Sequence, residues 1–249
     1  MEDLFKNIYS ISKNQKIIDE NIIINLLKSL VDYYSLNEYV ESINITNYKD
    51  NNLANYNINK KTININFQKM ILYIINNLPE NINEPKIKFL LVNLQILKIL
   101  LHELEHVNQE RKIRLNNDLE TKIYLRVQDW EYAIKDKNLD YYNRILYNIN
   151  PMERQANIVS IKKILKFIGL TDNIKIKNYF KNDYLFTIIK NYNIETSKYP
   201  LILYFNKYPY LREMKSLIYK TNHIFDQDLR GELGLKLSIK EYNNLKYKD

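Results

Sequence analysis

The feature that most constrains this chain of 249 residues is the segment at 102–106, which reads HELEH. It contains His102 and His106, two of only three histidines in the chain. On a helix, positions four residues apart lie one above the other on the same face, so both imidazoles can reach one metal ion. Glu103, beside the first histidine, is then placed to act as general base for a water at the metal. The pattern predicts a Zn²⁺ site on a helix.

The residues before this segment predict that its helix is buried. Positions 90–101 are nearly all apolar, which is typical of a helix that is covered on every side. We expect this helix to span about 86–115. Other helices are expected where apolar residues recur at helical spacing, at about 18–36, 67–78 and 119–136, and after Pro151, since proline favours a first helical position.

A small sheet is expected before the buried helix. Polar and apolar residues alternate over 39–45, 54–58 and 62–66, which is typical of strands, and 59–61 forms a hairpin turn. The chain is therefore predicted to be an α+β protein. We expect one mostly helical domain over 1–170 with a small antiparallel sheet beside the HELEH helix, and a helical C-terminal subdomain over 171–249 packed on it.

A zinc site with two histidines needs a third protein ligand. The best candidate is Glu153, held in the first turn of the helix that follows Pro151. Ala156 is small enough to let that helix approach the HELEH helix, and Asn157 is placed to hydrogen-bond the outer nitrogen of a ligating histidine. Glu131 and His223 remain alternative third ligands.

Net charge and composition bear on two questions, whether the protein binds nucleic acid and in which compartment it is found. The formal net charge is +8, which raises the question of nucleic acid. The basic residues are scattered, however, and we interpret their densest group as a solvated face, consisting of Lys162, Lys163, Lys166, Lys175, Lys177 and Lys181. There is no cysteine and no visible signal peptide or apolar span, so we expect a cytoplasmic protein that avoids membranes.

The sequence as a whole also resembles a known family of enzymes. The order of hairpin (ANYNINKKTININ), apolar helix, HELEH and then PMERQAN is similar to zincin metallopeptidases with a glutamate third ligand, closest to phage and mobile-element peptidases of low-GC Gram-positive bacteria. The resemblance covers about residues 50–168. It implies Zn²⁺ bound by His102, His106 and Glu153, with Glu103 as the catalytic base.

The resemblance also implies how a protein or peptide substrate is held. One hairpin strand would lie beside the cleft and pair with an extended peptide by strand addition. We assign this role to a free edge made by Thr62, Ile63, Asn64, Ile65 and Asn66. Stabilisation of the oxyanion would fall to His223, Arg154 or one of the tyrosines.

Two other functions compete with a zinc endopeptidase that acts on one or few protein targets. A zincin-fold protein can retain the metal as a clip and act by binding a partner. A nucleic-acid-associated protein is favoured only by the net charge.

Overall fold

The structure is a computed structural model that describes residues 2–46, 52–80, 82–115, 125, 151–169 and 174–183. The chain divides into two compact units, one formed by Met1–Leu115 and Ala156–Asn182, the other by Asn116–Gln155 and Asp183–Asp249. Nearly all described residues belong to the first unit. The predicted division at residue 170 stays a prediction. The expected helix at 119–136, Glu131, His223 and the elements beyond 183 lie outside the described residues, apart from the single residue Leu125.

The described residues form mostly helices and one small sheet. In chain order they are α1 (Glu2–Lys13), α2 (Glu20–Tyr33), η1 (Asn37–Tyr39), β1 (Ser42–Ile45), β2 (Ala54–Asn57), β3 (Thr62–Ile65), α3 (Phe67–Asn76), α4 (Pro85–Leu115) and α7 (Pro151–Ile168). A further helix covers 174–183. The α+β class and the expected positions of the hairpin and of α2, α3, α4 and α7 are confirmed, while α1 is an element that we did not predict.

Local sequence explains where several helices begin. The backbone N–H of Ile22 donates to the side chain of Asp19, which caps α2. Asn66 caps α3 in the same way by accepting from the backbone N–H of Lys69. α4 and α7 both begin at a proline, whose fixed φ suits the first helical position and whose missing N–H would have no partner there.

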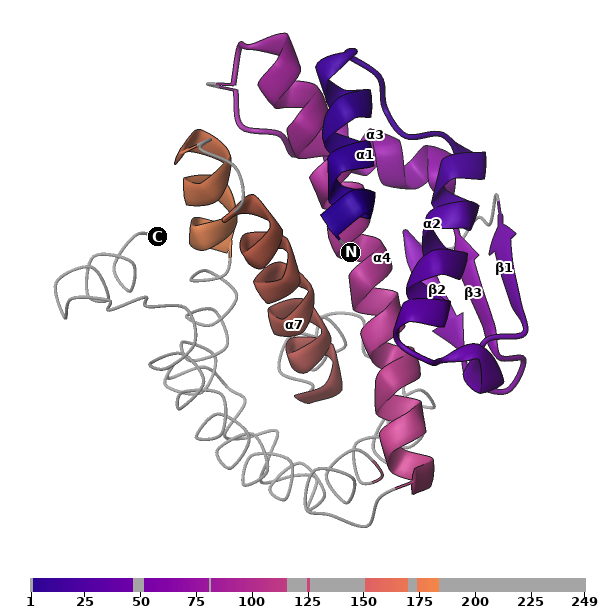
Figure 1. Cartoon of the computed structure of the whole chain (residues 1–249). Helices are drawn as coiled ribbons and strands as arrows, with labels where there is room; N and C mark the ends of the chain where they lie inside the picture. Colours follow the sequence, from indigo (N-terminus) through magenta and orange to yellow (C-terminus); the bar gives the residue numbers. More distant parts are fainter. Residues whose placement is uncertain are drawn as a thin grey trace, which may run out of the picture. The chain divides into compact units, whose positions relative to one another are not determined.

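α4 is the central helix of the first unit, as its apolar sequence predicts. Nine of its twelve residues from Leu90 to Leu101 are buried, and Leu97, Leu100 and Leu101 have no exposed surface. Figure 1 shows α4 running past the sheet, with β2 nearest to it, and past α7 on its other side. Among the described residues, no helix combines the length and apolar composition that crossing a membrane requires.

One buried amide ties the N-terminal segment to α4. Asn93 has no exposed surface. Its Oδ1 accepts from the backbone N–H of Ile18 at 3.0 Å, and its Nδ2 donates to Oγ of Ser12 and to the carbonyl of Lys16, both at 2.9 Å. The amide is thereby satisfied inside an apolar layer, which is the condition under which a polar side chain is tolerated there.

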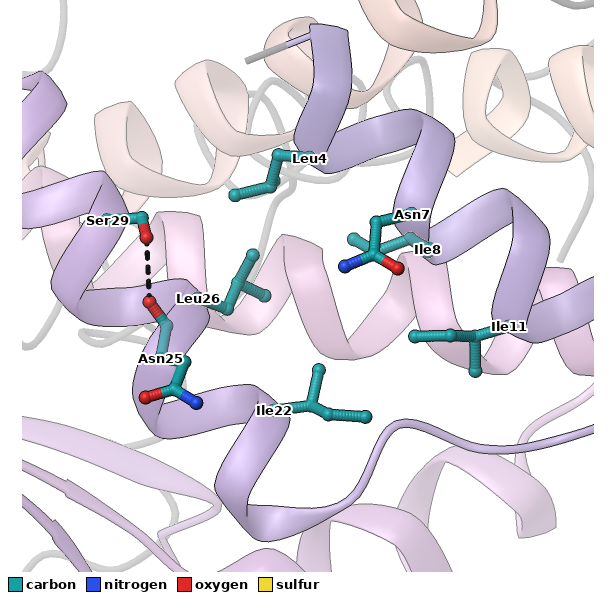
Figure 2. A pocket seen from close by; sticks show the side chains of 8 residues that line it. All are labelled: Leu4, Asn7, Ile8, Ile11, Ile22, Asn25, Leu26 and Ser29. Atoms are coloured by element: carbon teal, nitrogen blue, oxygen red, sulfur yellow. Dashed lines mark hydrogen bonds between the residues drawn. The ribbon is translucent and has the colours of Figure 1, made fainter.

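α1 and α2 leave a small hollow between them. Leu4, Ile8 and Ile11 of α1 line it on one side, and Ile22 and Leu26 of α2 on the other, around a cavity of about 200 Å³ (Figure 2). None of its lining residues belongs to α4 or α7, so this hollow is separate from the HELEH segment.

The sheet has the order β1-β3-β2. β3 pairs antiparallel with β2, as the hairpin predicts, and parallel with β1, so the sheet is mixed and not purely antiparallel. The prediction of a free substrate edge at Thr62, Ile63, Asn64, Ile65 and Asn66 is wrong. Thr62–Ile65 is the central strand, because β1 pairs with the side of the hairpin that we expected to be open. Asn66 follows this strand and caps α3.

The two faces of the sheet differ as the alternation predicts. Ile63 and Ile65 of β3 are fully buried against the helices. On the other face, Asn44, Asn64 and Asn55 stand side by side on the three strands. Nδ2 of Asn44 lies 3.3 Å from Oδ1 of Asn64, and Nδ2 of Asn64 lies 2.9 Å from Oδ1 of Asn55. The same register thus places the apolar side chains inside and joins the polar ones across the strands.

Candidate metal centre

The two histidines of α4 face a common point. Their Nε2 atoms lie 3.1 Å apart, and the two rings stand at 85° to one another. This follows from the i, i+4 spacing, which places both side chains on one helix face. Two nitrogens bound at about 2.0–2.1 Å to one tetrahedral Zn²⁺ lie about 3.3 Å apart, so the separation fits a shared metal ion.

Glu153 completes a group of three possible ligands. It lies in the first turn of α7, which is one continuous helix from Pro151 to Ile168. One ligand atom from each of His102, His106 and Glu153 lies within 4.8 Å of the other two, and the three residues are buried or half-buried. Two imidazoles and a carboxylate form a donor set that suits Zn²⁺. This group could therefore hold a metal ion.

The outer nitrogen of His106 has a partner that sequence reasoning missed. Nδ1 of His106 lies 2.9 Å from Oε1 of Gln109, a side chain with no exposed surface. A proton on Nδ1 donated to this oxygen leaves the lone pair of Nε2 free for a metal. The signal was available, because Gln109 follows His106 by three residues and so shares its helix face.

Asn157 was expected to support a histidine through its side chain, and this role stays a prediction. Its backbone carbonyl accepts from Oγ of Ser160 at 2.9 Å, one turn along α7. Arg154 lies in the first turn of α7 beside Glu153. Its role in stabilising an oxyanion, like that of His223, stays a prediction.

Glu103 is a buried carboxylate on the same helix, only 6% exposed. Being adjacent to His102, it points about 100° around the helix from that histidine and therefore flanks the metal-facing side. A buried acid beside two imidazoles is the arrangement that the HELEH pattern predicts for a general base.

Glu105, the second acid of the HELEH segment, has a structural partner. Its Oε2 lies 3.7 Å from Nζ of Lys163 on α7, and its Oε1 accepts from Nδ2 of Asn108 at 3.1 Å. Burial lowers the pKa of the Lys163 ammonium, and the carboxylate of Glu105 opposes that change. Our interpretation of Lys163 as part of a solvated face is therefore wrong, because the group faces a buried acid on α4.

Comparisons with known protein families, with curated proteins and with solved structures found no match to this chain.

Proposed function

We propose that this chain is a zinc metallopeptidase of the zincin type, which hydrolyses peptide bonds in one or few protein targets. The observation that carries the proposal is the group formed by His102, His106 and Glu153. A helix with the HELEH sequence and a glutamate from a second helix supply the ligand set that such enzymes use, and leave one position open for a water.

Each residue has a distinct role in this proposal. His102, His106 and Glu153 hold the zinc, and Gln109 holds the ring of His106 in the ligating tautomer. Bound zinc would polarise a peptide carbonyl and lower the pKa of a coordinated water. Glu103 accepts the proton of the attacking water and delivers it to the leaving amine.

Because β3 is the central strand, we assign the edge that would bind an extended peptide to β2 instead. Within the described part of the chain, β2 has a strand partner on one side only, and it packs beside α4. The N–H of Asn66 donates to the carbonyl of Leu53, so alternate residues of this strand face β3. By that alternation, Ala54 and Tyr56 direct their backbone groups outward. An extended peptide could add there as a further strand.

Such a binding mode selects flexible targets. A compact folded protein cannot present an extended strand, so cleavage is expected in a loop, a linker or a disordered tail. General activity on casein should nevertheless be weak, because the proposed enzyme acts on one or few protein targets.

The test begins with metal analysis of the purified protein and continues with two variants. We expect one Zn²⁺ per chain. Glu103→Gln should retain the zinc while peptide hydrolysis falls by roughly 10²–10⁴-fold, the usual contribution of a general base. Glu110→Gln is the matched control, since Glu110 is equally buried on α4 but pairs with Arg114.

Three results would count against the proposal. Absence of stoichiometric metal after zinc is added would remove its basis. Zinc binding with no Glu103-dependent hydrolysis would favour the partner-binding alternative. Retention on DNA that falls steeply with salt would favour the nucleic-acid alternative.

A further inference from the structure

A second connection between α4 and α7 exists beside the metal-ligand group. It is the ion pair of Glu105 and Lys163, whose side chains are only 5% and 25% exposed. Both residues belong to the same compact unit. An ion pair at this depth differs from the exposed pair of Lys175 and Glu84, whose side chains are 69% and 61% exposed and which water screens.

The pair is enclosed by a chain of polar contacts. Asn108 donates to Glu105, and Nη2 of Arg111 in turn donates to Oδ1 of Asn108 at 2.7 Å. Nη1 of Arg111 donates to the carbonyl of Tyr34 at 3.0 Å. The chain returns to Lys163, whose Nζ lies 4.2 Å from the centre of the Tyr34 ring. Two turns of α4, the end of α2 and the middle of α7 are thereby joined at one point.

Such a pair contributes specificity of packing more than stability. Stripping water from two charges costs about as much as their attraction returns, so apolar residues of similar size would stabilise the contact equally well. A charged pair differs because it tolerates little displacement. Sliding α7 by one turn would leave the carboxylate of Glu105 and the ammonium of Lys163 buried apart from one another.

The position of the pair links it to the metal ligands. Glu105 directly precedes His106 on α4. Lys163 follows Glu153 by ten residues on α7, which is about 15 Å along the axis and about 80° around it. Because α7 is continuous between the two residues, fixing Lys163 against α4 fixes the height and rotation of the turn that carries Glu153.

We propose that Glu105 and Lys163 are positioning residues, which hold α7 in the register that brings the carboxylate of Glu153 to the metal. This inference rests on the proposed metal site. It assigns to the second acid of the HELEH segment a role separate from that of Glu103, namely fixing the third ligand through a contact between helices.

The test measures zinc affinity by competition with a chromophoric chelator. Lys163→Met keeps the length of the side chain and removes its charge, and we expect the dissociation constant for zinc to rise roughly 10–100-fold, as for loss of a supporting residue. Lys166→Met, an exposed position one turn later on α7, is the matched control and should leave the affinity unchanged. Lys163→Arg should retain most of the affinity.

A double-mutant cycle of Lys163 with Glu153 separates a positioning role of Lys163 from a general loss of stability. If Lys163 acts through Glu153, then Lys163→Met should weaken zinc binding in the wild type and have no further effect in a Glu153→Ala background. An equal effect in both backgrounds would overturn the proposal, as would a folded Lys163→Met protein with wild-type affinity.

The design also covers a Lys163→Met variant that does not fold and a wild-type protein that does not bind zinc. Should Lys163→Met fail to fold, the double variant Glu105→Gln/Lys163→Met removes both charges and leaves no unpaired ion. It is expected to fold and still to bind zinc weakly, and wild-type affinity in this variant would overturn the proposal. Failure of the wild type itself to bind zinc would instead refute the metal site, and this inference with it.

Discussion

Oε1 of Gln109 lies 2.9 Å from Nδ1 of His106, on the side of the imidazole that faces away from His102. The contact ties the ring of a candidate metal ligand to the helix that carries it. With the proton on Nδ1 and donated to this oxygen, Nε2 carries the only lone pair of the neutral ring and is free to bind a metal.

Removing this contact should weaken metal binding without unfolding the protein. Gln109→Leu is expected to raise the dissociation constant for zinc about 10–100-fold, since the ring loses its orientation and tautomer preference. Gln109→Glu keeps an acceptor and should restore much of the affinity. Gln95→Leu is the matched control, because Gln95 lies on the same helix and bonds the hydroxyl of Tyr179. Equal affinities in all three variants would contradict the assignment.

Glu153→Ala should lower zinc affinity by more than the 10–100-fold expected for a supporting residue, because a ligand itself is lost. Glu131→Ala should have little effect. Titration of both variants with zinc decides between them. A larger loss in Glu131→Ala would show that the third ligand comes from the segment before α7 and that the group on α4 and α7 is fortuitous.

The outer edge of β2 can be altered by a substitution that leaves the candidate metal ligands unchanged. Ala54→Pro removes an N–H that points away from β3, so the sheet should survive while an added peptide strand loses a donor. We expect KM for a peptide substrate to rise with unchanged zinc binding. Ile43→Pro makes the corresponding change on β1, at the opposite edge of the sheet, and serves as control. Unchanged KM in Ala54→Pro would place the substrate elsewhere.

Tyr56 should make the protein sensitive to alkaline pH. Its hydroxyl donates to the carbonyl of Tyr39 at 2.8 Å. Burial, and then the negative charge of Glu110, raise the pKa of Tyr56 to about 12 from 10.0. Because the folded-state pKa is the higher one, this contribution to stability is complete below pH 10 and is lost as the pH rises towards 12.

Urea unfolding at pH 8, 10 and 11 tests this expectation. Tyr56→Phe should reduce the free energy of unfolding at pH 8 by about 1 kcal/mol, the usual value of one hydrogen bond, and should show a smaller further decrease at pH 11 than the wild type. Tyr73→Phe, at a position that is 54% exposed, should follow the wild type. Parallel pH profiles for all three proteins would contradict the role of Tyr56.

Features set by short sequence distances were predictable. The apolar run before His102 predicts a buried helix, the alternation around residues 59–61 predicts a hairpin, and Pro151 marks the start of α7. The spacing of Leu4, Ile8 and Ile11 would also have predicted α1, which we overlooked.

Features that depend on distant partners were not predictable. The alternation in 42–45 is the same whichever strand β1 joins, so the sequence could not show that it covers the open side of β3. Lys163 looks like any other lysine of its helix until its partner on α4 is known. The contact between His106 and Gln109 is different, because both residues lie on α4 three positions apart and the sequence spacing could have predicted it.

The hydrogen bonds of Asn93 bear on how far the protein can be shortened before α2. A truncated protein that starts at Glu20, where α2 begins, would lack Ser12, Lys16 and Ile18, which bind that amide in the described part of the chain. Without α1, the amide of Asn93 and the apolar side chains around it on α4 would be exposed to water, two and a half turns before His102. A truncated protein should therefore retain the first eighteen residues, even though they lie far in sequence from the candidate ligands His102, His106 and Glu153.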